Sequence, residues 1–278
     1  MNNILSKILC GVFIVFIISP GLSADAASRD TTVLANNISE GQSSVTTTLV
    51  IPANVIYPSS LQNNIEESLE YVKNYSLTKR EYLIHTYQKG KKYFPKIAAI
   101  LKQNHLPEEL KILIALESGF DANAVSGAGA VGYWQMMDEA AKEYGLHIAN
   151  GKETNKKAKR KDERKDLRKS TLAAAKYLHD RCKNLNNDLL LMVASYNCGV
   201  GKVWQAMRKS GRSNPGFWDI KKYLPTETKN YVMNFIALNV VFENYDKFIK
   251  NKMLFTSKKI ENMYTTEKIE NSFPAETL

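Results

Sequence analysis

Cysteine is scarce in this chain of 278 residues, which contains three. Cys10 lies in an N-terminal segment that we expect to be removed, so that Cys182 and Cys198 remain. If the helices that carry these two residues form a hairpin turning near Asn186, Cys198 lies about eight residues beyond the position opposite Cys182, or roughly 12 Å along the axis. A disulfide requires Cα atoms within about 7 Å of each other. We therefore expect two free thiols.

Histidine is also scarce, and its four positions are His85, His105, His147 and His179. None of them stands at a metal-ligand spacing from another, so the sequence predicts no metal site. We also find no arrangement of Ser, His and Asp that stands out as a catalytic triad. We expect the protein to use no cofactor.

A nucleotide-binding loop is missing as well, although the small-residue run Gly127–Gly132 fits the pattern G-x-G-x-x-G. That pattern binds dinucleotides only when a strand precedes it and a helix follows directly. Here a helix with a glycine stop comes before the run, and Tyr133 and Trp134 come after it. We therefore expect a tight loop or small hairpin that a polymer can approach closely.

The apolar segment near the N-terminus, Ile8–Ile18, is too short to cross a bilayer. Lys7 precedes it, and Ala24–Ala26 supplies a small-residue cleavage site. This pattern predicts a secretory signal peptide over residues 1–26, with an uncleaved anchor as the alternative. We expect an exported protein, in the periplasm or cell envelope, with no stable transmembrane segment after cleavage.

Negative charge is in deficit, because the formal net charge is +10 at pH 7. Export and the absence of a basic-aromatic RNA motif exclude nucleic acid as the expected partner. No basic amphipathic helix for a membrane surface is evident. The charge therefore favours an acidic polymer outside the cell.

Composition and periodicity divide the chain into four parts, the first of which is the predicted signal peptide, residues 1–26. Residues 27–60 are rich in Ser, Thr and Asn, with a short β-prone stretch, and are expected to form a flexible linker or arm. Residues 61–250 carry a helical period and are expected to form one globular domain with an N-terminal helical extension. Residues 251–278 are expected to be a polar, irregular tail. The predicted fold class is all-α, or α+β at most because of one small hairpin.

The helix that begins after Pro107 presents one carboxylate, Glu117, on the same face as Leu113 and Ile114. That face is the one an amphipathic helix buries. Gly119 is expected to end the helix, which places Glu117 in the last turn. Burial and the helix dipole both raise the pKa of a carboxyl group there. A carboxyl that stays protonated near neutral pH suits a general acid. The alternative is a surface Glu at a frayed helix end.

Other segments carry further recognisable patterns. A Glu-Ser pair, a Gly-x-x-Gln-x-Met segment, an Ala-x-Tyr-Asn-x-Gly segment and a Glu-Thr-x-x-Tyr-Val segment follow one another along the chain. In this order and context, the chain resembles the lytic transglycosylases of the lysozyme-like (SLT) superfamily. It is most similar to the membrane-bound lytic murein transglycosylase D group. The resemblance covers roughly residues 93–245. The four segments are Glu117-Ser118, Gly132–Met137, Ala194–Gly199 and Glu227–Val232.

The resemblance implies a lysozyme-like transglycosylase domain that cleaves peptidoglycan. It implies that Glu117 first acts as the acid and then as the base at the β-1,4 bond between N-acetylmuramic acid and N-acetylglucosamine. The product carries a 1,6-anhydromuramyl end. Acidic peptidoglycan strands fit the basic charge, and we expect a monomer. The residues implied to bind the substrate are Ser118, Gln135, Met137, Tyr196, Asn197, Glu227 and Tyr231.

Two other functions remain open at this point. A hydrolytic lysozyme on the same fold needs a second carboxylate that activates water, for which Asp121, Asp138 and Glu227 are candidates. A wall-binding or scaffold protein without activity would keep the fold, although an intact Glu117 speaks against it. The segment Asp162–Arg164 matches a recurring family segment whose role the sequence does not indicate.

Overall fold

The computed structural model describes residues 44–51, 53–148, 161–256 and 258–265. They divide into two compact units. Among the described residues, the helical unit covers residues 56–252, and the other unit combines those before Ile56 with those after Lys252. The predicted signal peptide, residues 1–26, and the first part of the predicted linker lie outside the described residues.

The helical unit begins with an N-terminal extension that packs against the last long helix. Tyr71 on α1 donates its hydroxyl to Asn234 Oδ1 on α10 at 2.7 Å. Leu61, Val72 and Leu83, one from each element of this extension, are fully buried. The elements of the extension are η1 (Ser59–Asn64), α1 (Ile65–Thr78) and α2 (Arg80–Gly90).

The middle of the helical unit holds the helix that delivers Glu117. A 3₁₀ turn after Pro107 leads directly into α4, and α3 packs against both this turn and α6. The elements here are α3 (Phe94–Gln103), η2 (Glu108–Ile112), α4 (Leu113–Ser118), α5 (Asp138–Glu143), η3 (Glu163–Lys165) and α6 (Leu167–Asn184).

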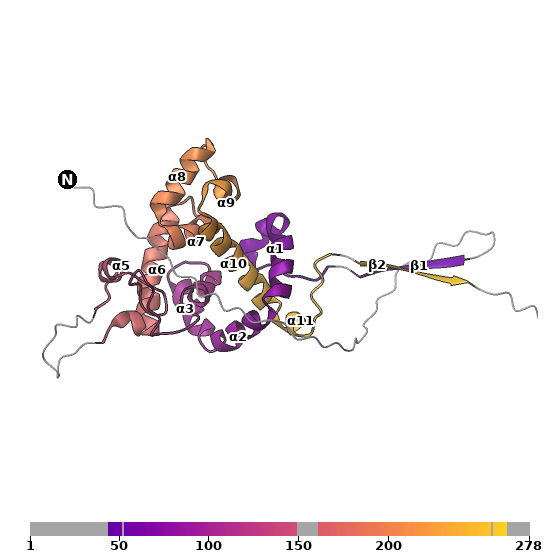
Figure 1. Ribbon diagram of the computed structural model, residues 1–278, viewed down its shortest axis with the longest axis horizontal. Coiled ribbons are helices and arrows are strands. Elements are labelled where there is room, and N and C mark those ends of the chain that lie inside the picture. The colour runs from indigo at the N-terminus through magenta and orange to yellow at the C-terminus, as the bar shows by residue number, and fades with distance from the viewer. Residues whose placement is uncertain (1–43, 52, 149–160, 257, 266–278) are drawn as a thin grey trace, which may run out of the picture. The chain divides into compact units, whose positions relative to one another are not determined.

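The centre of the core is α7, which is apolar almost all round and contacts α6, α8 and α10 (Figure 1). Helices that are hydrophobic on every side are the ones that proteins bury completely. Burial also extends along most of α10. The remaining elements are α7 (Leu189–Cys198), α8 (Val200–Ser210), α9 (Phe217–Ile220), η4 (Lys221–Tyr223), α10 (Thr226–Glu243) and α11 (Tyr245–Ile249). The prediction of an all-α class is confirmed for this unit.

The second unit contains two antiparallel strands, β1 (Ser44–Ile51) and β2 (Lys258–Thr265). Ser44 pairs with Thr265, and Ile51 pairs with Lys258. The sequence led us to expect an irregular tail after Phe255, and this expectation is wrong for β2. The β-branched residues of β1 favour a strand, but its partner comes from the opposite end of the chain. A local pattern cannot reveal such a pairing.

The capping preference of Ser and Asp predicts helix caps at Ser170 and Asp138, and both predictions are wrong. Helix α6 already begins at Leu167, and Asp166 Oδ1 accepts the N–H of Lys169 at 2.8 Å. Asp138 is the first residue of α5, and its carboxylate binds Arg164 instead. Across the described ranges, no helix has the length and apolar character needed to cross a bilayer.

Candidate active site

Glu117 stands in the last turn of α4, as the sequence predicts. Gly119 ends the helix with a left-handed backbone, φ 55°, a conformation that glycine adopts without steric penalty. Leu113 and Ile114 are fully buried on the face that Glu117 shares. Glu117 itself is half-buried, and its side chain opens onto a groove. The alternative of a surface Glu at a frayed end is therefore wrong.

The surroundings of Glu117 favour its neutral form. Burial is the largest influence and, together with the nearby negative charge of Glu227, it raises the pKa of Glu117 from 4.5 to about 7. The hydroxyl of Tyr231 opposes this shift, because it donates to Glu117 Oε1 at 2.5 Å and stabilises the charged form. The carboxyl thus titrates near neutral pH, where it can both give and take a proton.

The groove beside Glu117 is lined mainly by neutral side chains. One wall comes from the groove loop, residues 120–137, which connects α4 to α5. The other wall comes from α6 and α7, each of which contributes one tyrosine. The larger side chains that line the groove are Glu117, Gln135, Met136, Met137, Tyr177 and Tyr196.

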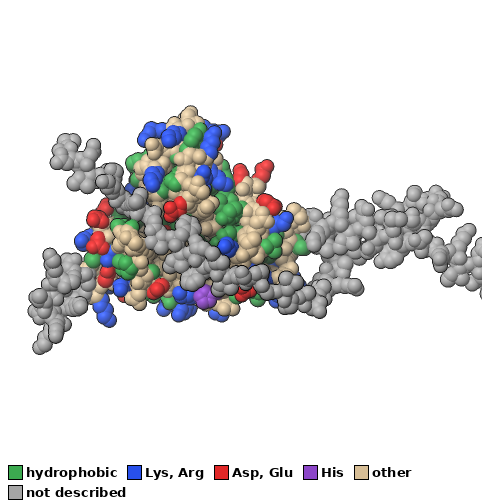
Figure 2. Space-filling view, in the orientation of Figure 1, with side chains coloured by type: hydrophobic (Ala, Val, Ile, Leu, Met, Phe, Trp, Pro, Cys, Tyr) green, Lys and Arg blue, Asp and Glu red, His purple; other side chains and the backbone are tan. Residues whose placement is uncertain are grey.

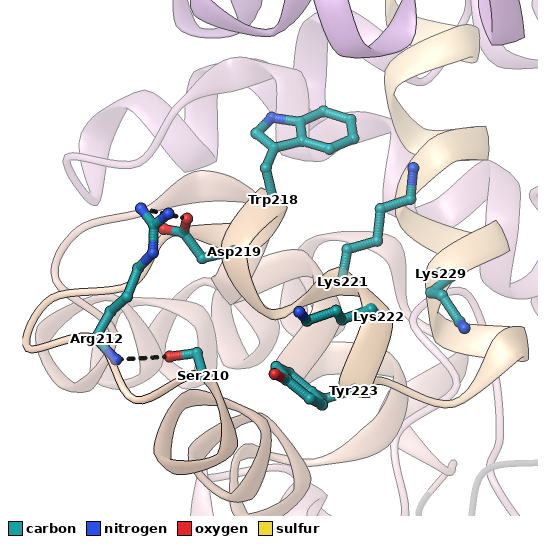
Figure 3. Close-up of a pocket in the computed structure, with 8 residues that line it drawn as sticks. All are labelled: Ser210, Arg212, Trp218, Asp219, Lys221, Lys222, Tyr223 and Lys229. Atoms are coloured by element: carbon teal, nitrogen blue, oxygen red, sulfur yellow. Dashed lines mark hydrogen bonds and ion pairs between the residues drawn. The ribbon is translucent and has the colours of Figure 1, made fainter.

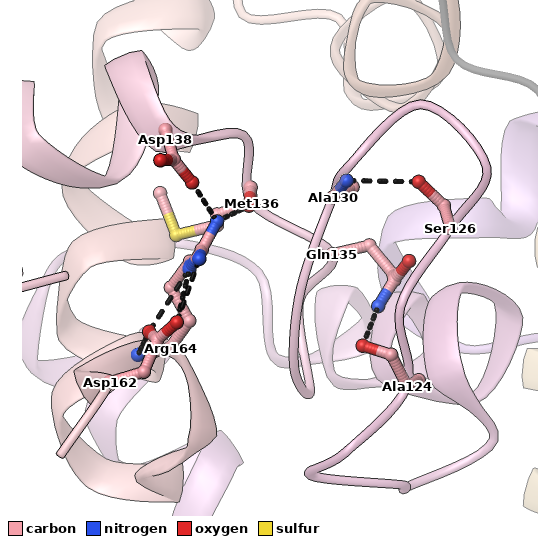
Figure 4. Close-up of polar contacts among 8 residues, drawn as sticks. All are labelled: Ala124, Ser126, Ala130, Gln135, Met136, Asp138, Asp162 and Arg164. Carbon is pink, nitrogen blue, oxygen red and sulfur yellow. Dashed lines mark hydrogen bonds and ion pairs between the residues drawn. The ribbon is translucent and has the colours of Figure 1, made fainter. Parts of the chain in front are cut away.

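The groove loop folds back on itself as a small hairpin. Val131 forms isolated bridges with Val125 and with Met136. The Ser126 hydroxyl accepts the N–H of Ala130 at 2.9 Å (Figure 4). These contacts confirm the predicted tight loop or small hairpin and exclude the dinucleotide interpretation, because a hairpin follows the helix.

Gly132 permits a close approach between the groove loop and the segment before α6. A Cβ at this position would collide with the backbone carbonyl of Arg164, and its φ of 83° further disfavours any side chain. The glycine that opens the predicted Gly-x-x-Gln-x-Met segment is therefore required by packing against Arg164. This contact fixes one side of the groove wall.

Arg164 holds the end of the groove loop in place (Figure 4). Its buried guanidinium donates to both carboxylate oxygens of Asp162, with Nε–Oδ1 at 3.0 Å and Nη2–Oδ2 at 2.7 Å. It also donates to the carbonyl of Met136 at 3.2 Å and to Asp138 Oδ1 at 2.5 Å. A planar guanidinium suits such a multiple contact, because its N–H groups form a rigid fork. The segment Asp162–Arg164, whose role the sequence did not indicate, therefore supports the groove wall.

Trp134 anchors the same loop to the core. Its indole N–H donates to Thr171 Oγ1 on α6 at 3.0 Å, and the side chain is completely buried. Its backbone carbonyl accepts the hydroxyl of Tyr196 at 2.7 Å. The Tyr196 ring lies edge to face with those of Trp134 and Tyr177. Tyr196 therefore supports the loop while its side chain also lines the groove.

The structure brings together five of the predicted site residues. Gln135 and Met137 line the groove with Glu117 and Tyr196, and Tyr231 contacts the acid directly. Gln135 has a left-handed backbone, φ 45°, and its amide nitrogen donates to the carbonyls of Ala124 and Gly132. Because that nitrogen is engaged, the amide oxygen is the atom of Gln135 that is left to accept a hydrogen bond from a ligand.

Three other predicted residues do not line the groove. Ser118 donates its hydroxyl to the carbonyl of Tyr133 at 2.8 Å and so ties the helix to the groove loop. Asn197 is buried, and its Oδ1 accepts the hydroxyl of Thr228 at 2.7 Å. Glu227 acts on Glu117 through its charge. These three residues influence the site without lining the groove.

The three candidate second carboxylates differ in what they contact. Asp138 is paired with Arg164, and Asp121 is exposed and accepts the N–H of Asn123 at 2.8 Å. Of the three candidates, Glu227 is the one whose charge affects the pKa of Glu117. Sequence reasoning missed Arg164, Thr171 and Tyr177 as parts of the site. The available signal was the segment Asp162–Arg164, but nothing in that segment indicates what its residues contact.

Cys198 at the end of α7 is a free, buried thiol. Burial raises its pKa above the ordinary value, which disfavours the reactive thiolate. Among the described residues, no group of three or more His, Cys, Asp or Glu side chains is placed to hold a metal ion.

Comparisons with known proteins agree with the four sequence segments. Residues 94–216 match the family described as the Transglycosylase SLT domain. The chain is 34% identical over 185 residues to the membrane-bound lytic murein transglycosylase D of Escherichia coli, an alignment that covers 66% of this chain and 37% of that protein. The chain thus spans little more than a third of the length of this relative.

Solved structures of two lytic transglycosylases also match. For the soluble lytic transglycosylase SLT70 of Escherichia coli, the TM-score is 0.46 with 19% identity, covering 58% of this chain and 25% of that one. For an inactive mutant of Slt from Pseudomonas aeruginosa, the TM-score is 0.45 with 20% identity, covering 59% and 25%. The family match and the 34% identity confirm the predicted resemblance: this chain is similar to the lytic transglycosylases of the SLT superfamily, in particular to membrane-bound lytic murein transglycosylase D.

Proposed function

We propose that this protein is a lytic transglycosylase that cleaves peptidoglycan between N-acetylmuramic acid and N-acetylglucosamine without consuming water. The observation that carries the proposal is Glu117, a desolvated acid with a pKa of about 7 that opens onto a groove of neutral side chains. The SLT family match and the 34% identical relative support the same activity.

The first step is proton transfer from the Glu117 carboxyl to the oxygen that bridges the two sugars. At neutral pH a group with this pKa is protonated in a large fraction of molecules, unlike an ordinary Glu. The bond from the bridging oxygen to muramyl C1 then breaks, and the oxygen leaves as the hydroxyl of N-acetylglucosamine. The muramyl 2-acetamido group stabilises the positive charge that develops at C1.

The second step closes the ring. The Glu117 carboxylate takes the proton of the muramyl C6 hydroxyl, whose oxygen attacks C1 and forms the 1,6-anhydro bond. Glu117 returns to its protonated form, so one carboxyl group serves both steps and no water enters the product. The hydroxyl is tethered to the reacting sugar, which gives it a high effective concentration relative to solvent water.

The remaining residues divide into two groups in this proposal. Gln135, Met137 and Tyr196 contact the glycan strand, with the Gln135 amide oxygen accepting a hydrogen bond from the sugar. Tyr231 orients the carboxylate of Glu117, and Glu227 tunes its pKa. Ser118 and Asn197 hold the elements that carry these groups.

The proposed partner also sets the proposed location. Peptidoglycan lies outside the cytoplasmic membrane, and the Escherichia coli relative is named as a membrane-bound protein. We infer an exported protein of the periplasm or cell envelope that acts as a monomer. The N-terminal pattern of a secretory signal supports export.

The test is mass analysis of products from purified peptidoglycan. We expect muropeptides with a 1,6-anhydro ring, one water lighter than lysozyme products, and no incorporation of oxygen from heavy-oxygen water at the new muramyl ends. Labelled, reducing ends would show a hydrolase instead. No cleavage by folded protein that still binds peptidoglycan would show a wall-binding protein.

A further inference from the structure

A second hollow, larger than the groove, lies on the same helical unit where α8 ends and α10 begins (Figure 3). We call it the basic hollow. It encloses about 520 Å³ and holds one carboxylate, Asp219, among four cationic side chains. Its main residues are Arg212, Trp218, Lys221, Lys222, Tyr223 and Lys229. The proposed reaction uses none of them.

Three of the four cations carry charge that no neighbouring carboxylate neutralises directly. Arg212 is paired with Asp219, with Nη1–Oδ1 at 2.8 Å (Figure 3). Within the described ranges, no ion pair involves Lys221, Lys222 or Lys229. A group of unpaired ammonium groups around one hollow creates a local positive potential.

Aromatic rings hold two of these ammonium groups in place. Lys221 Nζ lies 4.7 Å from the centroid of the Trp218 ring, and Lys222 Nζ lies 5.0 Å from that of Tyr223. The Trp218 ring is itself fixed, because its N–H donates to Asn64 Oδ1 at 2.7 Å. Cations over ring faces lose part of their freedom before any ligand arrives. The positive charges are therefore pre-organised rather than spread through solvent.

The charges in the basic hollow also repel one another. Burial and, secondarily, the charge of Lys229 lower the pKa of Lys221 below its ordinary value, while Glu67 on α1 acts weakly in the opposite direction. Each of the two ammonium groups is thus more stable when an anion lies near it. Binding of an anion relieves this repulsion, and that gain adds to the direct attraction.

The chemistry of the basic hollow favours carboxylates over phosphate. Proteins grip phosphate most specifically with the bidentate fork of Arg. Here one nitrogen of the Arg212 fork, Nη1, is already paired with Asp219. The remaining cations are separate lysine point charges beside aromatic surface, which suits a ligand whose carboxylates are spaced along a chain. Exposed Lys202, Arg208 and Lys209 extend the positive surface along α8, where Figure 2 shows Lys and Arg side chains gathered.

We propose that the basic hollow binds the carboxylates of an acidic peptide, namely the stem peptide of peptidoglycan. The identity of the peptide rests on the proposed function, whereas the preference for carboxylates rests on the side chains of the hollow. The groove then acts on the glycan while the basic hollow holds a peptide of the same or a neighbouring strand. Turnover of peptide-bearing strands gains from this contact, and turnover of peptide-free glycan does not.

The test uses the full chain with Glu117→Gln, which prevents turnover. Calorimetric titrations compare a free stem peptide, the same peptide with its carboxylates amidated, and sodium phosphate. The test variant adds Lys221→Gln and Lys229→Gln. The matched control adds Lys102→Gln and Lys250→Gln, which remove two exposed charges away from the hollow.

We expect the free peptide to bind. Amidation of the peptide, or the Lys221 and Lys229 substitutions together, should weaken binding about tenfold, because each exposed ion pair contributes modestly to affinity. The control pair changes binding less than about twofold and shows the effect of net charge alone. Equal losses in both variants, or binding that survives amidation, would overturn the proposal. Phosphate binding as tightly as the peptide would also overturn it, because the site would then be a general anion site.

A second measurement separates this inference from the proposed function. The Lys221/Lys229 variant with Glu117 intact is compared with the unmodified chain on peptide-bearing and peptide-free glycan strands. A several-fold loss on peptide-bearing strands alone supports the basic hollow. Equal rates on both substrates, with anhydro products still formed, overturn the basic hollow and leave the function standing. Absence of anhydro products from both proteins overturns the proposed function.

Discussion

The groove and the basic hollow are two depressions on one helical unit with opposite chemistry. The groove is smaller, is lined mainly by neutral side chains and contains a single acid that titrates near pH 7. The hollow is larger and is lined by four cations, three of them without an ion-pair partner among the described residues. In the groove, neutral and apolar surroundings raise the pKa of one carboxyl group, that of Glu117. In the hollow, the excess of positive charge makes a surface that attracts anions.

The comparison teaches that the size of a depression is a poor guide to its chemistry. A carboxyl group becomes an acid at neutral pH because its surroundings cannot stabilise its charge. A small apolar groove meets that requirement better than a wide, solvated one. The basic hollow instead gathers charges of one sign, which favours the binding of an anion.

Substituting the acid tests this contrast most severely. Glu117→Gln keeps the shape of the side chain but removes its transferable proton, so we expect cleavage to fall by about three orders of magnitude or more. Peptide binding at the basic hollow should stay within twofold. Release of anhydro-muropeptides measures the first effect, with Glu66→Gln on the exposed face of α1 as the control. Activity within tenfold of the unmodified chain would show that Glu117 is not the proton donor.

Removing the support of the groove wall should give the next largest effect. Arg164→Met leaves Asp162 without its partner and frees the end of the groove loop. Loss of a buried pair costs about 3–5 kcal/mol, but Asp138 is 44% exposed, so we expect on the order of 2 kcal/mol. Thermal or urea unfolding measures this loss.

The control for this change is Arg168→Met, because Arg168 is exposed on α6. Arg164→Lys retains charge but not the rigid fork, so it should recover only part of the stability. If Arg164→Met and Arg168→Met unfold at the same temperature, the groove wall does not depend on the guanidinium.

A change at Tyr231 sharpens the comparison, because it alters the pKa of the acid without removing it. The Tyr231 hydroxyl stabilises the carboxylate form of Glu117 and so lowers its pKa. Tyr231→Phe therefore raises that pKa further. In the unmodified chain, activity falls near pH 7 as Glu117 loses its proton. We expect this limb of the pH–activity profile to move upward by about one pH unit in Tyr231→Phe.

Tyr71→Phe is the matched control, since it removes a hydroxyl bonded to α10 far from the acid in sequence. Its pH profile should coincide with that of the unmodified chain. A downward shift of the limb in Tyr231→Phe would contradict the donor role of this hydroxyl.

The smallest effect is expected at Tyr196. From the sequence, Tyr196→Phe lowers activity with little change in stability if its hydroxyl faces the substrate, and lowers stability if Tyr196 is a core residue. In the structure the hydroxyl donates to the carbonyl of Trp134. We therefore expect Tyr196→Phe to cost about 1 kcal/mol of stability and to reduce activity a few-fold through the loop. An unchanged melting temperature with a large loss of turnover would restore the direct role.

The sequence predicted best what depends on neighbouring residues. The end of α4 at Gly119 and the burial of the face that carries Glu117 follow from local geometry, and the structure confirms both. The direction of the pKa shift of Glu117 followed from the same burial, and it too is confirmed. The order of the helices was likewise readable from periodicity.

Long-range contacts could not be predicted in this way. Nothing near Arg164 indicates that it reaches Met136 and Asp138, and Asp138 looked like a cap because that is the common role of Asp at a helix start. Asn197 stands within a recognisable segment, yet its side chain turns to Thr228 on α10. A motif fixes which residues are present, but packing decides which way they face.

The bond from Tyr231 to Glu117 joins residues 114 positions apart in the chain. Helix α10 also supplies Glu227 and contacts α4, and it is synthesised long after α4. While a growing chain lacks α10, Glu117 is without the partner that orients it and without part of the packing around α4. A growing chain that stops before α10 therefore carries Glu117 without the contacts that orient its side chain and set its pKa.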